Sequence, residues 1–294
     1  MKKAAPPSLI KWTGSKRSQA ASIASLFPVS SEDSTYFEPF LGSGAVLYYG
    51  IQYFQKAVAS DIYAPLIDLW NNVKNNSSFV IQQYSKDWGL LQSSFPDYFY
   101  TVRDRFNAQA NGIDLLFLSR TCVNGIIRFN ADGNFNNSIH LSRRGMQPSR
   151  FSQIVLNWAQ VIQKTNFKTC DYQDILKLVK EGDFVYLDPP YANSHNRYIK
   201  DLDIHQLIEF LGALNSRNVK WALSFDGTRG GKDMSYEIPK SLYVYKTLIT
   251  SGNSAVQKVL NSSVEPVQES LYLNYDPPEY SVHDDGPEQI LLGF

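Results

Sequence analysis

The chain has 294 residues, of which 43% are hydrophobic and 19% charged, and its 28 basic residues balance its 28 acidic ones. This composition predicts one or two ordinary hydrophobic cores and excludes a disordered, fibrous or small disulfide-stapled protein. The two cysteines lack metal-ligand spacing, and no run approaches the ~18 consecutive apolar residues of a membrane span, so we expect no metal, no membrane association and a cytoplasmic location.

The N-terminal part of the chain has the alternation typical of a parallel sheet. A short apolar strand is predicted at Tyr36 to Phe40, and a turn with two glycines separates it from a helical stretch between Val46 and Phe54. A second strand at Ala57 to Ser60 and a helix around Leu66 to Val73 follow. This βαβα order predicts a parallel sheet whose ligands bind beyond the carboxyl ends of its strands.

The next segment, 75–164, is predicted to be an inserted domain. It is rich in Tyr, Phe, Ser, Asn and Arg with mostly helical periodicity, and its Asp132-Gly133 between apolar residues is a hairpin signal. Between Thr101 and Cys170, nine basic residues stand against three acidic ones. Such an excess indicates either a nucleic-acid contact, because Lys and Arg neutralise phosphates, or a solvated helical surface.

Strand patterns return after the insert, together with a helix from about Ile204 to Asn215. The strands are predicted at Phe167 to Cys170, Phe184 to Leu187, Val219 to Phe225, Leu242 to Leu248 and Ser270 to Asn274. The simplest architecture is a doubly wound α/β sheet formed by 1–74 and 165–294, interrupted by a mainly helical domain at 75–164 that carries a β-hairpin.

The turn after the first strand has features of a cofactor loop. Gly42 and Gly44 lie between a strand and a helix, where glycine lets the backbone approach a ligand, although a tight βα turn has the same pattern. Asp61 ends the next strand 19 residues after Gly42, where an acidic side chain can bind ribose hydroxyls. Because the third glycine of a dinucleotide motif is missing, a cofactor with a ribose but no pyrophosphate fits better, and S-adenosylmethionine is the common one.

The most specific motif is the strand 184–187 followed by Asp188-Pro189-Pro190-Tyr191. Two adjacent prolines form a rigid turn whose carbonyl oxygens remain available as acceptors. A carboxylate and a carbonyl can together hold an amino group by both hydrogens, and Tyr191 offers a face on which a planar base can stack, at about 1–3 kcal/mol. The alternative is a strand that merely ends at a Pro-Pro turn.

In order and spacing, these motifs resemble the DNA adenine methyltransferase (Dam-like) family over almost the whole chain. The resemblance includes Ile10 to Lys16, Phe37 to Gly44, a segment from Asn124 to Asn136 that is similar to the family's recognition hairpin, and Glu269 to Tyr275, which resembles its last strand. It implies an S-adenosylmethionine-dependent enzyme with a Rossmann-like methyltransferase sheet, from a bacterial or phage-infected cell. The implied reaction is methylation of the exocyclic N6 amino group of adenine in double-stranded DNA, by base flipping and direct transfer.

The resemblance also implies roles for individual residues. The expected catalytic residues are Asp188, Pro189, Pro190 and Tyr191. The expected cofactor-binding residues are Trp12, Lys16, Phe40, Gly42, Gly44, Asp61, Asp171 and Asp188. Of these, Lys16 is expected to neutralise the cofactor's carboxylate and Asp171 to face its adenine end. The expected DNA-binding residues are Arg128, Asn130, Asn136, Arg143 and Arg144, in an insert that serves as the target-recognition domain.

Some features leave alternatives open. Gly14-Ser15 stands where relatives have Gly-Gly, and Asn136 to His140 departs from the pattern of members that recognise GATC, so the target sequence stays open. A second Asp-Pro-Pro, at Asp276, lacks the aromatic residue and is interpreted as a plain turn. An RNA or protein amide methyltransferase and a catalytically silent DNA-binding module are the alternative functions. A cognate restriction endonuclease that acts separately is the further partner considered.

Overall fold

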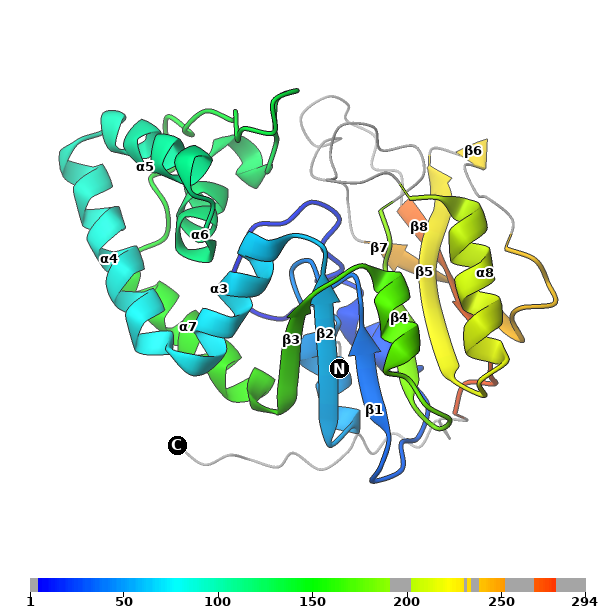
Figure 1. Ribbon diagram of the computed structural model, residues 1–294. Helices are drawn as coiled ribbons and strands as arrows, with labels where there is room; N and C mark the ends of the chain where they lie inside the picture. The colour runs from blue at the N-terminus through cyan, green and yellow to red at the C-terminus, as the bar shows by residue number, and fades with distance from the viewer. Residues whose placement is uncertain (1–4, 191–201, 230–231, 234–237, 252–266, 279–294) are drawn as a thin grey trace.

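The computed structural model describes residues 5–190, 202–229, 232–233, 238–251 and 267–278. They form an eight-stranded sheet with the order β3-β2-β1-β4-β5-β8-β7, in which β6 pairs with β5 (Figure 1). The strands are β1 (Thr35–Glu38), β2 (Lys56–Asp61), β3 (Thr165–Thr169), β4 (Phe184–Leu187), β5 (Lys220–Arg229), β6 (Lys232–Asp233), β7 (Tyr245–Ser251) and β8 (Val267–Leu273). The pairs from β3 to β5 are parallel, whereas β8 is antiparallel to both of its neighbours. The predicted doubly wound α/β fold is confirmed.

The strand predictions are correct in place and differ only at the ends. β4 coincides with the predicted 184–187, and the other predicted strands are shifted by one to four residues at either end. The two-residue β6 was not predicted, because so short a strand leaves no periodic pattern in the sequence.

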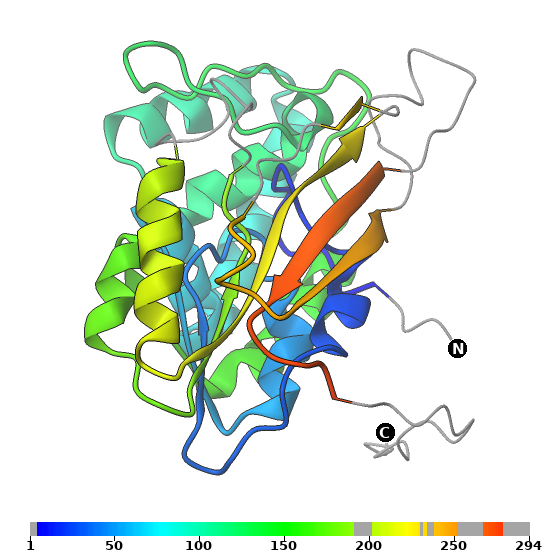
Figure 2. The same ribbon diagram turned by 90° about the vertical axis from the view of Figure 1, so that its right-hand side faces the viewer.

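Strand β4 shows that helices cover both faces of the sheet. All four of its residues are buried, as is typical of a central parallel strand. Phe184 and Tyr186 join the hydrophobic cluster that includes helices α1 (Ala20–Ala24) and α2 (Leu47–Gly50), whereas Val185 and Leu187 join the cluster under α8 (Ile204–Asn215). In Figure 2, α8 lies along one side of the sheet. This alternation holds the end of β4 in a fixed position.

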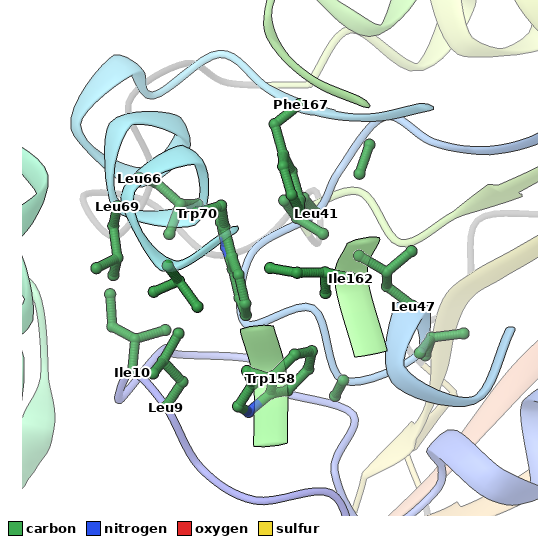
Figure 3. Close-up of a cluster of buried hydrophobic side chains, with 14 of the residues drawn as sticks. Leu9, Ile10, Leu41, Leu47, Leu66, Leu69, Trp70, Trp158, Ile162 and Phe167 are labelled. Atoms are coloured by element: carbon green, nitrogen blue, oxygen red, sulfur yellow. The ribbon is translucent and has the colours of Figure 1, made fainter. Parts of the chain in front are cut away.

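The helical insert lies beside the β3 edge of the sheet (Figure 1). Its helices are α4 (Ser77–Ser93), α5 (Asp97–Ala108), α6 (Gly112–Thr121) and α7 (Pro148–Val161), and α3 (Ala64–Asn75) connects them to β2. The core continues from the insert into the sheet: Trp70 of α3 lies 4.8 Å from the Trp158 ring of α7 and stacks at 5.9 Å on Phe167 of β3 (Figure 3). At the α3–α6 contact, the backbone N–H of Gly112 donates to Asp68 at 2.7 Å.

The predicted hairpin is present between α6 and α7. Phe129 and Phe135 form an antiparallel bridge around a turn in which the Asn130 side chain accepts hydrogen bonds from the backbone of Asp132 and Asn134. The side chain of Asn107, on α5, donates to the backbone carbonyl of Phe135 at 3.1 Å and accepts from its N–H at 2.8 Å. The hairpin is therefore anchored to the helices by an amide that the sequence did not single out.

Candidate active site

The carboxyl ends of β1, β2, β3 and β4 surround the point, between β1 and β4, where the strand order reverses. Ligands of doubly wound sheets bind in the crevice at this switch point. A cavity opens there, lined by residues that follow each of these strands and by the N-terminal segment. Of the residues predicted from the sequence, its lining includes Trp12, Lys16, Phe40, Gly42, Asp61, Asp171, Asp188, Pro189 and Pro190.

Asp61, at the end of β2, holds the glycine loop. One carboxylate oxygen accepts the Gly42 N–H at 3.1 Å, and the other accepts the Tyr63 N–H at 3.0 Å. Burial raises the pKa of Asp61 to about 6, against the opposing effect of these backbone hydrogen bonds. Each oxygen can accept a further hydrogen bond, so the carboxylate is suited to a pair of ligand hydroxyls.

Two tryptophans define the shape of the glycine loop. Gly42 has φ +48°, and a Cβ there would lie 3.0 Å from the indole of Trp12. The indole N–H of Trp70 donates to the Gly42 carbonyl at 3.3 Å. Sequence reasoning missed Trp70, because its place on α3 reads as an ordinary core position.

Gly44 is not among the described residues that line the cavity. Its backbone has φ +66°, and a Cβ there would lie 3.0 Å from the Trp70 ring. Its N–H donates to the Leu41 carbonyl at 2.8 Å. Gly44 therefore shapes the loop from behind.

Lys16 lies against the Asp-Pro-Pro motif. Its Nζ is 2.7 Å from Oδ1 of Asp188 and 3.6 Å from Oε2 of Glu269, on β8. The side chains of Lys16, Asp188 and Glu269 are 4%, 18% and 16% exposed, so this ion-paired cluster is shielded from water. Burial raises the pKa of Asp188 to about 6, with Lys16 lowering it and Glu269 raising it. Glu269 entered the sequence analysis only as part of the last strand.

Glu38, at the end of β1, is a buried carboxyl on the cavity wall that the sequence analysis did not assign. The hydroxyl of Tyr36 donates a hydrogen bond to it. Burial raises the pKa of Glu38 to about 8, the Tyr36 hydrogen bond lowers it and the Asp188 charge raises it. Glu38 is therefore mostly protonated at neutral pH.

Glu38→Gln is expected to make the protein less sensitive to alkaline pH. A carboxyl whose pKa is raised on folding stabilises the fold at low pH, and this contribution is lost between its ordinary value, 4.5, and about 8. Across that window the variant should gain about 1.4 kcal/mol of unfolding free energy relative to wild type per pH unit. Urea unfolding of both proteins at pH 5 and pH 8 measures this, and parallel pH profiles would refute it.

A stacked pair of aromatic rings also lines the cavity. The rings of Phe40 and Tyr172 stack with centroids 5.1 Å apart. Asp171 precedes Tyr172, lines the cavity, and accepts the backbone N–H of Gln173 at 3.1 Å. Phe40 and Asp171 thus both line the cavity, and the Phe40 ring contacts the residue that follows Asp171.

The two Asp-Pro-Pro motifs lie in different environments. Asp188, Pro189 and Pro190 line the cavity, while Tyr191 lies outside the described residues. Asp276 is exposed and follows β8. Because β8 is antiparallel to β5, its end lies toward the amino ends of the parallel strands, opposite the cavity. The interpretation of Asp276 as a plain turn agrees with this placement.

The predicted DNA-binding residues have exposed side chains on the insert. Arg128 donates through Nε to the Asn136 side chain at 3.0 Å across the hairpin. Asn130 is used in the turn itself. Arg144 lies over the Phe95 ring at 4.1 Å, and Arg143 is close enough to Lys11 for its charge to contribute to lowering the Lys11 pKa, behind the larger effect of burial.

Comparisons with known proteins identify the family. A model described as D12 class N6 adenine-specific DNA methyltransferase matches residues 12–252. The chain belongs to this family. M.MjaIII, a Type II methyltransferase of Methanocaldococcus jannaschii, is 31% identical over 241 residues, 73% of this chain and 82% of that protein. A DNA adenine methylase of Haemophilus influenzae is 30% identical over 187 residues, 62% of this chain and 63% of that protein.

The solved structure of another methyltransferase is only weakly similar to this chain. A precorrin-6y C5,15-methyltransferase from Geobacter metallireducens matches over 92% of this chain and 95% of its own chain, at 10% identity and a TM-score of 0.37.

The activity follows from membership of the family. The protein is an adenine-specific DNA methyltransferase that uses S-adenosylmethionine, as the sequence resemblance implied.

The residues of the cavity suit S-adenosylmethionine. Trp12 and the glycine loop, packed against each other, line the cavity, Asp61 offers acceptors for ribose hydroxyls, and Phe40 offers an apolar ring for a purine. The carboxylate of Asp188 suits the positive charge of a sulfonium. No group of three or more potential metal ligands occurs among the described residues, and none of their helices combines the length and hydropathy of a membrane span.

Proposed function

We propose that the methyltransferase flips an adenine out of duplex DNA into this cavity and methylates its N6 amino group in one direct step. The observation that carries the proposal is that Asp188, at the rigid end of β4, lies in one cavity with the glycine loop and Asp61. Extruding a base from a duplex costs a few kcal/mol, which stacking on an aromatic side chain can offset. We assign that stacking role to Tyr191.

The chain's own residues hold the amino group. The Asp188 carboxylate and the Pro189 carbonyl each accept one N6 hydrogen, which directs the nitrogen lone pair and stabilises the positive charge that develops on it. S-adenosylmethionine, when bound, supplies the electrophilic methyl group. Lys16 has a second carboxylate, Glu269, within 3.6 Å, so it stays paired when Asp188 turns to the substrate. For this reason we place Lys16 beside Asp188 rather than solely at the cofactor's carboxylate.

The division of labour that we infer follows the sequence. Residues 1–74 and 165–294 form the catalytic and cofactor-binding part, and 75–164 form the target-recognition part. The exposed Arg128, Asn136, Arg143 and Arg144 would contact DNA, since Arg can bind phosphate or a guanine edge. Asn130 would contribute by holding the turn.

The biological setting that we infer is DNA marking in the cytoplasm of a bacterial or phage-infected cell. The similarity to a relative named as a Type II methyltransferase supports the proposal that a cognate restriction endonuclease acts separately on the same sequence. If so, DNA methylated by this enzyme should resist a nuclease encoded beside its gene. A neighbourhood without any nuclease gene would favour a solitary enzyme.

Transfer of tritiated methyl groups to plasmid DNA, followed by long-read sequencing, tests the function directly. We expect label in DNA but not in RNA or protein, and N6-methyladenine at one recurring sequence. Methylation of cytosine, or label only in RNA or protein, would refute the proposal.

The rate of methyl transfer should fall on the acid side of about pH 6. The pKa of Asp188 is raised from 3.8 to about 6, so the acidic limb should lie near 6 instead of near 3.8. Below that pH, kcat/KM for DNA should decrease about tenfold per pH unit. Only the ionised form of Asp188 both accepts the N6 hydrogen and stabilises the positive charge that develops on the nitrogen. Because the pKa of Asp61 is also raised to about 6, the measurements are made at saturating S-adenosylmethionine, so that weaker cofactor binding does not contribute to the acidic limb. An acidic limb near pH 4 would contradict the assignment of Asp188.

A further inference from the structure

One arm of the recognition hairpin, residues 126–130, faces the cofactor cavity and solvent in alternation. Ile127 and Phe129 line the cavity, whereas Ile126, Arg128 and Asn130 are exposed. Successive side chains of an extended segment point to opposite sides. The arm is thus a shared wall, with the cavity on one side and a predicted DNA contact on the other.

Phe129 continues a row of rings that ends at the glycine loop. Its ring lies 5.8 Å from that of Tyr63, edge to face at 72°, and Tyr63 lies 6.3 Å from Trp12. The Trp12 indole lies against Gly42. Three segments far apart in the sequence therefore contribute adjoining aromatic surface to the cavity.

The arm is held by contacts with the second arm of the hairpin and with α5. Phe129 is bridged to Phe135 on the second arm, and Asn107 holds Phe135 through both its backbone N–H and its carbonyl. Arg128 donates to Asn136 on that same second arm. A ligand that fixes the Phe129 ring also restricts Arg128, because the two side chains leave adjacent residues of one cross-linked hairpin.

We propose that Phe129 is a cofactor-contacting residue through which donor binding and target recognition are linked. This deepens the proposed function and rests on the cavity assigned there. A donor that packs against Phe129 fixes the arm in the position that presents Arg128 to DNA. Since linkage is reciprocal, bound DNA should tighten donor binding by the same factor.

The first test measures S-adenosylhomocysteine binding by calorimetry in the absence of DNA. Phe129→Ala should raise its Kd about fivefold, the magnitude expected for loss of one aromatic contact. Phe129→Leu keeps an apolar wall with little risk to folding and should show a smaller increase. Arg128→Ala is the matched control from the opposite side of the arm, and its Kd should equal that of wild type.

The second test measures the affinity for an unmethylated duplex that contains the enzyme's target sequence, with and without S-adenosylhomocysteine. The ratio of the two affinities should approach one in Phe129→Ala. In Arg128→Ala both affinities should fall and their ratio should also move toward one, because the donor no longer positions an arginine for DNA, whereas its S-adenosylhomocysteine Kd without DNA stays at the wild-type value. A Phe129→Ala protein with wild-type melting temperature and either a wild-type Kd or a wild-type ratio would overturn the inference.

A third variant separates failure of this inference from failure of the cavity assignment. Asp61→Asn should weaken S-adenosylhomocysteine binding about 100-fold whether or not Phe129 contacts the donor. If Asp61→Asn binds normally, the proposed cavity is wrong. If only Phe129→Ala binds normally, the cavity stands and the linkage through the hairpin is wrong.

Discussion

Asp188→Ala is expected to lower kcat for DNA methylation by about three orders of magnitude, the upper end of the loss seen when one group that stabilises transition-state charge is removed. The carboxylate stands at the end of β4, ion-paired to Lys16, and it carries the full negative charge that the neighbouring Pro189 carbonyl lacks. Binding of duplex DNA and of S-adenosylhomocysteine should largely survive. Tritiated-methyl transfer under single-turnover conditions, with parallel binding measurements, distinguishes loss of chemistry from loss of binding.

Asp276→Ala is the matched control for this experiment. It removes the acid of the second Asp-Pro-Pro motif, which is exposed and lies at the opposite end of the sheet. Its kcat should stay within about twofold of wild type, as is usual for surface substitutions. Near wild-type turnover in Asp188→Ala, or a large loss in Asp276→Ala, would show that the catalytic motif has been assigned wrongly.

Asp61→Asn is expected to weaken S-adenosylhomocysteine binding by about 100-fold. The carboxylate accepts N–H groups from Gly42 and Tyr63, one on each oxygen. An amide turns one of these acceptors into a donor, so one buried N–H loses its partner at a cost of about 1–3 kcal/mol and the glycine loop is displaced. Calorimetric titration with S-adenosylhomocysteine measures the loss, and thermal unfolding measures the accompanying destabilisation.

Asp68→Asn provides the comparison, because Asp68, like Asp61, accepts a backbone N–H of a glycine but does not line the cavity. It accepts the Gly112 N–H at 2.7 Å at the contact between α3 and α6. This variant should lower the melting temperature yet bind S-adenosylhomocysteine as wild type does. Equal losses of affinity in both variants would mean that Asp61 acts only through general stability.

The parts of the site that could be predicted are those encoded within single segments. Asp188 and its prolines follow a continuous apolar strand, and Gly42 with Asp61 sits at strand ends with a spacing typical of a nucleoside site. These are local patterns, and their meeting in one cavity follows from parallel pairing. The hairpin was found for the same reason, since Asp132-Gly133 is a local turn signal.

The parts that were missed depend on distances between segments. Trp70 lies 28 residues after Gly42 on a helix whose apolar pattern predicts only burial. Glu38 gives no sign in the sequence that burial will keep it protonated, because desolvation depends on everything packed around it. Phe129 lies at the edge of the predicted turn, where no sequence pattern distinguishes a cavity residue from an ordinary hairpin residue.

The sequence by itself determined the fold class, the family and the identity of the motifs, because strand runs, glycine turns and the Asp-Pro-Pro step depend on neighbours along the chain. Only the tertiary structure decided that Lys16 pairs with Asp188 and Glu269, and that the recognition hairpin forms a wall of the cofactor cavity. Charge pairing, desolvation and ring contacts act through space, so residues more than a hundred positions apart acquire these roles only once the sheet and the insert have packed together.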